Sequence, residues 1–389
     1  MPLGIYVQVP FCQTKCTYCN FHTGVVSRDR YAPYAEAVCR EIAGSHEWTA
    51  NVARDCVDSV YFGGGTPSLI EPAALADILS ALRASFAWSP GRAEVTLEAD
   101  PETITAEKAS AWCEAGFNRI SLGAQSFHDA ELKAAGRMHR RADIYSAVSL
   151  LRAEGFGNIS LDLIAGLPHQ TRETWESSVS EPLQLRPEHV SIYLLEIDEG
   201  SRLGKESLAG GSRYSAAAIP SDDQMAECYE SACARLAAAG YEHYEISNWA
   251  LPGCRSRHNL KYWRREPYIG FGAGAHSFDG ASRWANAHDS ARYVAIVEAG
   301  NSPREQMEVV TTEQAFEEEL FLGLRQLDGI DFEGVVRRYP QSLAARIGGV
   351  RERLAELRSQ GLVEFDGEHL RLAPGRLTVS NEVLVELLG

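Results

Sequence analysis

The sequence of 389 residues lacks any long hydrophobic run and any excess of positive charge. No window approaches the roughly 18 consecutive apolar residues that a membrane-spanning helix requires, and the N-terminus lacks the basic and apolar regions of a signal peptide. The sequence therefore predicts a cytoplasmic protein. With 37 Lys and Arg against 53 Asp and Glu, the formal charge is −16. This balance argues against nucleic acid as a partner, because phosphates require clustered cations.

Internal repeats and low-complexity tracts are also absent. Hydrophobic residues make up 45% of the chain and charged residues 23%, which are ordinary values for a globular protein. At about 150 residues per domain, the length predicts two or three domains.

Short β-branched or apolar runs alternate with amphipathic segments over the first half of the chain. Strands are predicted at 5–9, 58–62, 94–98, 119–122, 160–164 and 191–195. Helices are predicted at 31–43, 72–85, 106–115, 142–154 and 172–180. This alternation predicts an α/β fold with a parallel sheet, either a partial (β/α)6 barrel or an open sheet. We expect functional residues at the carboxyl ends of the strands.

The second half of the chain is less regular. The Gly- and Ser-rich stretch 199–215 predicts a loop, 222–239 a helix and 244–247 one further strand, and the pattern loosens over 285–304. Helices at 312–324, 349–360 and 380–388 and a hairpin at 362–372 resemble a winged-helix unit. We therefore expect a first domain over 1–285 and a smaller α+β, winged-helix-like domain over 300–389. Its acidic composition argues against DNA binding.

Three of the nine cysteines lie together directly after the first predicted strand. Cys12, Cys16 and Cys19 form a C-x3-C-x2-C pattern on one loop, whereas the other six are scattered. Thiols at such close spacing indicate a metal ion or a cluster. One alternative is zinc, with His22 as a fourth ligand. The other is a four-iron four-sulfur cluster in which one iron stays open to another molecule.

The cysteine loop resembles the cluster loop of the radical S-adenosylmethionine (radical SAM) proteins. The resemblance rests on the cysteine spacing, on Tyr18 before the last cysteine and on the position after the first strand. It implies that Cys12, Cys16 and Cys19 ligate a four-iron four-sulfur cluster whose open iron holds the amino and carboxylate groups of SAM. In that family the cluster and SAM supply radical chemistry, while the protein fixes the geometry.

Polar motifs follow successive predicted strands in the order GGGTP, LEADP, LGAQSF, GRMH and LDLIAGLP. One such residue alone is more often a structural cap, but several in series suit a ligand with ribose hydroxyls, a carboxylate and an adenine edge. Their order closely resembles the oxygen-independent coproporphyrinogen dehydrogenase group of radical SAM proteins. The resemblance implies SAM contacts at Tyr6, Gly64, Gly65, Thr66, Glu98, Gln125, Arg137 and Asp162.

Two departures separate the chain from the dehydrogenases of that group. Those enzymes continue the cysteine motif as C-x3-C-x2-C-x-C, whereas this chain has Phe21 at the additional position. They also carry an extension ahead of the loop, and here Cys12 lies near the start. Both departures match a sister family of haem chaperones. We therefore favour a haem chaperone, with oxidative decarboxylation of coproporphyrinogen III as the alternative, and whether the chain is an enzyme stays open at this point.

The stretch HNLKYW at 258–263 reproduces the H-N-x-x-Y-W signature of those chaperones. The resemblance implies haem as a ligand, with His258 as its axial ligand and His276 as a second candidate. Tyr262 and Trp263 have rings that can pack on a porphyrin, and a basic cluster of Lys261, Arg264 and Arg265 suits its propionates. The alternative is that His258 caps a turn while the aromatic rings fill a core.

The same resemblance names the expected partners. They are haem and haem-accepting apo-proteins, including acceptors at the membrane surface that the chaperone would reach from the cytoplasm. The sequence does not decide whether the chain forms a homodimer.

Overall fold

The computed structural model describes the chain apart from residues 1, 48, 50–51, 53, 55 and 89–90. The strands are β1 (Leu3–Val9), β2 (Val57–Gly64), β3 (Glu94–Ala99), β4 (Arg119–Gln125), β5 (Ile159–Ala165), β6 (His189–Leu194), β7 (Glu242–Glu245), β8 (Asn248–Ala250), β9 (Tyr268–Phe271), β10 (His276–Phe278), β11 (Ser282–Asn286), β12 (Arg304–Val309), β13 (Ile330–Asp331), β14 (Val363–Phe365) and β15 (His369–Leu372). The α-helices are α1 (Tyr31–Gly44), α2 (Pro72–Ser85), α3 (Ala106–Ala115), α4 (Asp129–Ala134), α5 (Arg141–Ala153), α6 (Arg172–Leu185), α7 (Arg202–Leu208), α8 (Asp222–Ala238), α9 (Arg257–Trp263), α10 (Ser290–Glu298), α11 (Thr312–Gly323), α12 (Phe332–Arg338), α13 (Ala344–Ser359) and α14 (Ser380–Leu388).

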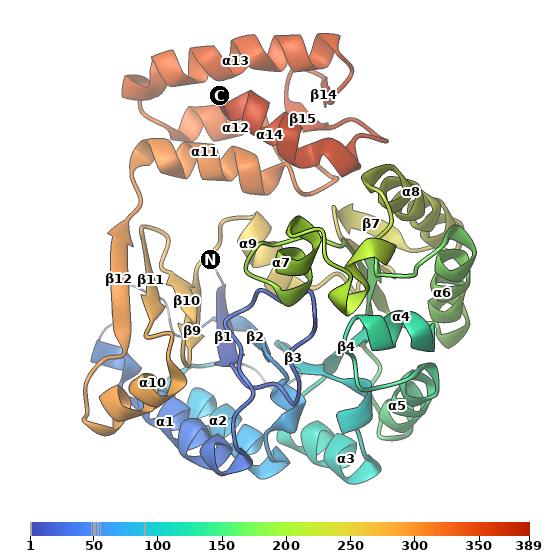
Figure 1. The fold of residues 1–389 in the computed structure, drawn as a ribbon. Helices are drawn as coiled ribbons and strands as arrows, with labels where there is room; N and C mark the ends of the chain where they lie inside the picture. The colour runs from blue at the N-terminus through green and yellow to red at the C-terminus, as the bar shows by residue number, and fades with distance from the viewer. Residues whose placement is uncertain (1, 48, 50–51, 53, 55, 89–90) are drawn as a thin grey trace.

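The first sheet has twelve strands in the order β12-β11-β10-β9-β1-β2-β3-β4-β5-β6-β8-β7. Strands β1 to β6 run parallel in sequence order, with Ile5 beside Val60 and Leu97 beside Ile120. Strand β9 adds a further parallel strand beside β1, and antiparallel strands continue the sheet beyond β9 and beyond β6. The helices α1, α2, α3, α5, α6 and α8 lie around the outside of the curved sheet (Figure 1). The predicted partial (β/α)6 barrel is confirmed.

The parallel strands are apolar because helices cover their outer face and the barrel interior covers the other. Ile5, Val60, Leu97 and Ile120 are all fully buried in one continuous core. Helix α2 contributes to this core through Leu75, Ile78, Leu79 and Leu82, whose spacing of three and four residues gives one apolar face. The polar ends of the strands are left free to form a site.

A smaller α+β domain lies above the barrel in Figure 1, where α11 to α14 are drawn in orange and red. It contains the three-stranded sheet β13-β15-β14 and a separate core that includes Phe316, Leu320, Phe332 and Leu384. This agrees with the winged-helix-like unit predicted from the sequence. Strand β12 belongs to the first sheet and ends at Val309, so the division between 285 and 300 remains a prediction.

Two local predictions are wrong in part, and the stretch of weak pattern contains a helix. The stretch 199–215 is not all loop, because it contains α7, whose cap Ser201 accepts a hydrogen bond from the backbone of Gly204. The stretch 285–304 contains α10, which buries only Tyr293 and Val297 and so gives a weak periodic signal. The segment 244–247 is a strand only in its first half: Tyr244 and Glu245 end β7, and residues 246–247 connect β7 to β8.

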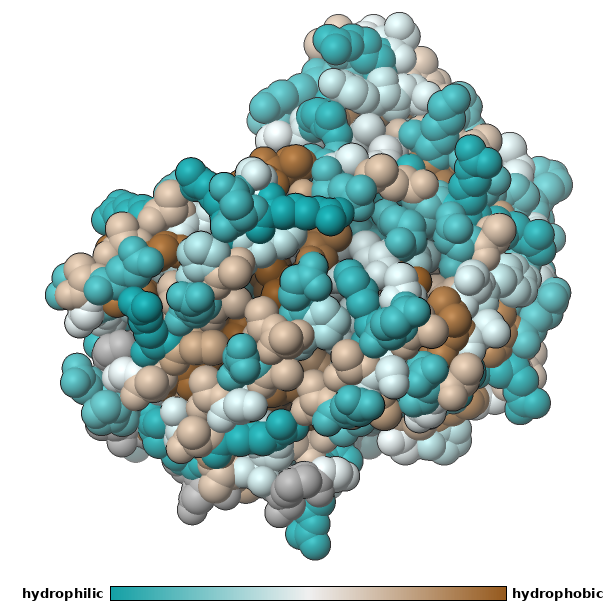
Figure 2. All heavy atoms as spheres, turned by 90° about the horizontal axis from the view of Figure 1, so that it is seen from below, coloured by the Kyte–Doolittle hydropathy of each residue, from teal (hydrophilic) through white to brown (hydrophobic). Residues whose placement is uncertain are grey.

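Within the described residues, no helix is both long and apolar enough to cross a membrane. Figure 2 shows the protein from below, with hydrophilic side chains over much of that face and hydrophobic residues in separate patches.

Candidate functional site

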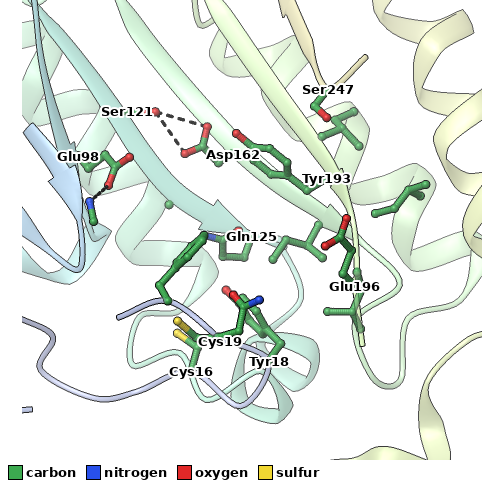
Figure 3. A pocket seen from close by; sticks show the side chains of 18 of the residues that line it. Cys16, Tyr18, Cys19, Glu98, Ser121, Gln125, Asp162, Tyr193, Glu196 and Ser247 are labelled. Atoms are coloured by element: carbon green, nitrogen blue, oxygen red, sulfur yellow. Dashed lines mark hydrogen bonds between the residues drawn. The ribbon is translucent and has the colours of Figure 1, made fainter. Parts of the chain in front are cut away.

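A cavity of about 700 Å³ lies at the carboxyl ends of the parallel strands. Its wall includes most of the site residues predicted from the sequence: Cys12, Cys16, Cys19, Gly64, Gly65, Thr66, Glu98, Gln125, Arg137 and Asp162. Figure 3 shows Cys16 and Cys19 on the loop facing Gln125, with Glu98 of β3 and Asp162 of β5 beyond it. Three predicted residues, Tyr6, His258 and His276, are not part of this wall.

The cysteine loop is fixed to the barrel by backbone hydrogen bonds. The Cys12 N–H donates to Gly24 at 3.0 Å, and the Thr17 N–H donates to Ala135 at 3.0 Å. All three cysteines are free and partly exposed. Burial, the main influence, raises the pKa of the Cys12 thiol, so binding a cluster there would release a proton.

Arg137 places a buried positive charge beside the thiols. Its guanidinium lies 3.5 Å from Cys16 Sγ, donates to the Gly123 carbonyl at 3.0 Å and forms an ion pair with Asp100. Although burial opposes the charge, the Asp100 carboxylate raises the pKa of Arg137. The sequence reading missed Asp100. It could have been found in LEADP, because residues two apart on an extended strand face the same side.

The glycines of GGGTP are required by close packing against β1 and the cysteine loop. A Cβ atom on Gly65 would lie 2.4 Å from the Phe11 carbonyl oxygen. Gly64 has a φ of 109°, and its Cβ would lie 2.3 Å from Gln8 Nε2. The backbone therefore passes directly beneath the cysteine loop, where its polar groups can reach a ligand.

Two carboxyl groups lie deeper in the cavity. Glu98 accepts hydrogen bonds from the Tyr61 hydroxyl at 2.7 Å and the Gly64 N–H at 3.1 Å. Asp162 accepts one from Ser121 at 3.2 Å, drawn as a dashed line in Figure 3. Burial raises the pKa of Glu98 to about 7 and also raises that of Asp162. Both groups suit polar contacts such as ribose hydroxyls or an amino group.

The cavity continues away from the cysteines toward the C-terminal domain. Tyr193, Glu196 and Ser247 form part of this wall (Figure 3), and Asn381 of α14 reaches it from the C-terminal domain. The segment after α11 is joined to β7 through the Leu327 N–H, which donates to Tyr244 at 3.1 Å. Both domains therefore contribute to one cavity.

Several polar atoms in this second half have no hydrogen-bond partner among the described residues. They include Glu245 Oε2, Asn248 Oδ1, Arg325 Nε and Trp263 Nε1. Glu245 is fully buried, and burial raises its pKa to about 7. The Arg325 guanidinium lies 4.9 Å from the centre of the Trp263 ring. Because buried polar groups are normally paired, this half of the cavity is equipped for a second ligand. This group was not predicted from the sequence, because Arg325 lies far along the chain from Glu245, Asn248 and Trp263.

The histidine of the H-N-x-x-Y-W motif lies inside the protein. His258 is 1% exposed, and its Nδ1 and Nε2 atoms lie 3.1 Å from Ser59 Oγ and 2.9 Å from the Tyr262 hydroxyl. Its ring stacks on Tyr61 at 5.1 Å, and burial lowers its pKa to about 3. Tyr6 packs on the same two rings, and its hydroxyl donates to Gln8 at 2.8 Å. Of the motif, Asn259, Tyr262 and Trp263 line the cavity.

The basic cluster predicted beside this motif does not form. Lys261 is buried and makes ion pairs with Asp58 at 2.6 Å and Glu266 at 3.1 Å. Arg265 pairs with Glu318 at 2.7 Å, and Arg264 donates to Gln326 at 3.3 Å. Two of the three cations are therefore used within the fold, which the sequence could not show because their acidic partners lie in other segments.

The described residues contain no group of three or more His, Cys, Asp or Glu side chains placed to hold a single metal ion. A zinc site would need four ligands within about 2.3 Å of one point. The three cysteines instead line a large cavity with the Arg137 guanidinium 3.5 Å from Cys16 Sγ, and the wall beside them includes polar residues. The residues present therefore fit a cluster with an adjoining SAM better than one zinc ion.

Comparison with known families supports this fit. Residues 6–181 match the family model of the Radical SAM superfamily, and residues 310–375 match the HemN C-terminal domain. Membership of the superfamily implies a four-iron four-sulfur cluster and SAM as cofactors.

A solved structure has the same fold over nearly the whole chain. It is that of coproporphyrinogen III oxidase (HemN) from Escherichia coli, a radical SAM enzyme. The TM-score is 0.84 at 23% identity, with 99% of this chain and 90% of that chain covered. At this identity the likeness shows the fold alone.

Curated relatives match over most of their length. The heme chaperone HemW of Bacillus subtilis is 34% identical over 99% of this chain and 98% of its own. The heme chaperone HemW of Synechocystis is 36% identical over 97% of this chain and 90% of its own. The mitochondrial radical S-adenosyl methionine domain-containing protein 1 of Bos taurus is 33% identical over 99% and 87%. The chain therefore belongs to the HemW family of radical SAM proteins.

Proposed function

We propose that this protein is a haem chaperone, which binds haem and delivers it to haem-requiring proteins. The observation that carries the proposal is the end-to-end similarity to curated haem chaperones at 34% and 36% identity. Phe21 supports it, because the dehydrogenases have a further cysteine at this position and the side chain here is 66% exposed at the cavity wall.

The proposed cluster ligands are Cys12, Cys16 and Cys19, and the proposed SAM contacts are Tyr6, Gly64, Gly65, Thr66, Glu98, Gln125, Arg137 and Asp162. All except Tyr6 line one cavity, which supports a shared ligand. When bound, the cluster and SAM supply reductive cleavage of the sulfonium. This chain's own contributions are the Arg137 charge beside Cys16 and the hydrogen-bonded carboxyls of Glu98 and Asp162.

His258 is the ligand that the motif proposes for the haem iron. Coordination through Nε2 would require the hydroxyl of Tyr262 to leave, and coordination through Nδ1 would require Ser59 to leave. Haem would also have to reach a ring that is 1% exposed. His258 could therefore bind haem iron only if α9 moved away from the barrel. His276 is the second proposed ligand.

Decarboxylation of coproporphyrinogen III is the second candidate function. The HemN-like fold and the second, partly unpartnered half of the cavity favour it, because such an enzyme needs room for a substrate beside SAM. Phe21 and the full-length similarity to chaperones count against it.

The proposal extends to where the protein acts. We propose delivery from the cytoplasm to apo-proteins, including acceptors at the membrane surface, and a homodimer as an assembly to test by light scattering.

Two assays on the anaerobically purified, cluster-loaded protein test the proposal. The chaperone should bind haem with a defined Soret band and yield no protoporphyrinogen from coproporphyrinogen III with SAM and reductant present. A coproporphyrinogen dehydrogenase assayed in parallel shows that the conditions permit turnover. Turnover by this protein would replace the chaperone with the enzyme, and a failure to bind haem would exclude the chaperone.

A further inference from the structure

Three exposed histidines gather beside the cysteine loop. His22 follows Cys19 on the loop, His276 begins β10, and His288 lies between β11 and α10. The ring centroids of His22 and His288 are 4.7 Å apart, and those of His276 and His288 are 6.4 Å apart. His22 lies far from the other two in sequence, so the fold brings the three imidazoles together.

Short backbone contacts hold the three rings in place. Gly24, close after His22, donates its N–H to Pro10 at 2.9 Å. The Asn286 N–H donates to the Ala275 carbonyl at 2.9 Å, and the Gly274 N–H donates to the Ala287 carbonyl at 3.0 Å, which fixes His276 next to His288. A Cβ on Gly274 would lie 3.1 Å from His288 Nδ1, so a glycine there leaves room for the ring.

The ring nitrogens of these histidines are free. None of the three makes a hydrogen bond or ion pair with any described residue, in contrast to His258, whose two ring nitrogens are both engaged. Partial burial, together with the neighbouring imidazoles of His288 and His22, lowers the pKa of His276. This shift favours the neutral imidazole, which is the form that binds iron.

The surroundings suit a porphyrin better than a bare metal ion. No described group of three or more donors is placed around a single ion. Haem iron brings four equatorial nitrogens with it and needs only one or two protein ligands. Phe21 and Val25, 66% and 59% exposed, flank His22 with apolar surface, and the Lys15 ammonium lies 3.4 Å from the Phe21 carbonyl oxygen, where it can meet a propionate.

We infer that His22, His276 and His288 form a surface site for haem iron next to the cysteine loop. The inference rests on the proposed haem-carrier function and names the site at which it operates. A surface site suits a carrier, because the ligand of an acceptor protein can approach the iron without unfolding the chaperone. The buried His258 would then hold α9 and Tyr262 in place rather than touch the metal.

The test compares two sets of variants by haem titration of the cluster-loaded protein, followed as difference spectra in the Soret region. One set contains His22→Ala, His276→Ala, His288→Ala and the triple variant. The second contains His258→Gln, and His369→Ala on β15 is the matched control, since it removes an exposed histidine from the other domain. Thermal unfolding checks that each variant is folded.

The triple variant should bind haem about tenfold or more weakly and show a shifted Soret band, because an axial ligand is lost. His369→Ala should behave as the wild type. If the triple variant binds haem with the affinity and spectrum of the wild type, the proposed site is wrong but the carrier function still stands. Absence of haem binding in the wild type would overturn the carrier function itself, so the two failures are distinguishable.

Discussion

The cysteine loop and helix α9 carry the two most specific motifs of the sequence, but the surroundings of their side chains differ. The thiols of Cys12, Cys16 and Cys19 are free and face the cavity. In α9, by contrast, His258 and Lys261 are buried and bonded within the fold. A motif can therefore mark a family either through residues that meet a ligand or through residues that position others. Residues that meet a ligand have free, partly exposed polar atoms, whereas residues that position others are buried and hydrogen-bonded.

The largest expected effect concerns the cysteine motif, whose thiols are free. Replacement of Cys12, Cys16 or Cys19 by Ala should abolish the cluster, because three thiolates are the fewest that ligate it with one iron open. Iron and sulfide analysis and the broad visible absorption after anaerobic reconstitution measure this loss. Cys113→Ser, an exposed cysteine on α3, should retain a full cluster. One bound zinc and no iron in the wild type would show that the motif has been misread.

Substitutions in the motif on α9, whose residues are bonded within the fold, should mainly lower the stability of the protein. His258→Ala removes a buried ring with two hydrogen bonds, which should lower the free energy of unfolding by about 2–4 kcal/mol. His276→Ala should change it by about 0.5 kcal/mol or less, because the ring is exposed and unbonded. Denaturant unfolding measures both. Equal effects of the two substitutions would remove the distinction between a structural and an accessible histidine.

These two regions also show how far the sequence could be interpreted. The six parallel strands and their polar ends were predicted because each strand is a compact apolar run followed by a recognisable motif. The bonding of His258 was not, because Ser59 lies 199 residues away in sequence. The ion pairs of Lys261 and the unpartnered group of Glu245, Asn248 and Arg325 depend on the same long-range folding. Helix α7 was missed because it is short and lies in a Gly- and Ser-rich stretch.

Substitutions in the SAM pocket should have an intermediate effect, on the affinity for SAM. Asp162→Ala and Glu98→Ala should each weaken SAM binding to cluster-loaded protein by about 1–3 kcal/mol, the worth of a buried polar contact. The isosteric variants Glu98→Gln and Asp162→Asn remove the charge but keep the size of the side chain. Glu107→Ala, on the exposed side of α3, is the control. Calorimetry gives the affinities. If both alanine variants bind SAM as the wild type does, the cavity holds SAM in another way.

The smallest expected effect is in the pH dependence of stability. Burial lowers the pKa of His258 to about 3, below the roughly 6.5 of an unfolded chain, so only the unfolded state takes up a proton between these values. The stability that neutral His258 contributes is present above pH ~6.5 and lost as the pH falls. Between pH 7 and 5 the wild type should lose up to about 2 kcal/mol more than His258→Gln. Denaturant midpoints at both pH values, with His369→Gln as control, measure the difference, and parallel curves for wild type and His258→Gln would contradict it.

The most direct measurement is of haem transfer by the wild-type, cluster-loaded protein. Haem-loaded protein is mixed with an apo-acceptor, and the rise of the acceptor's Soret band is compared with capture by a scavenger that takes up only released haem. A haem chaperone should transfer haem to the acceptor faster than the scavenger captures it, at a rate that increases with acceptor concentration. Equal rates with both, independent of acceptor concentration, would show passive release and contradict delivery.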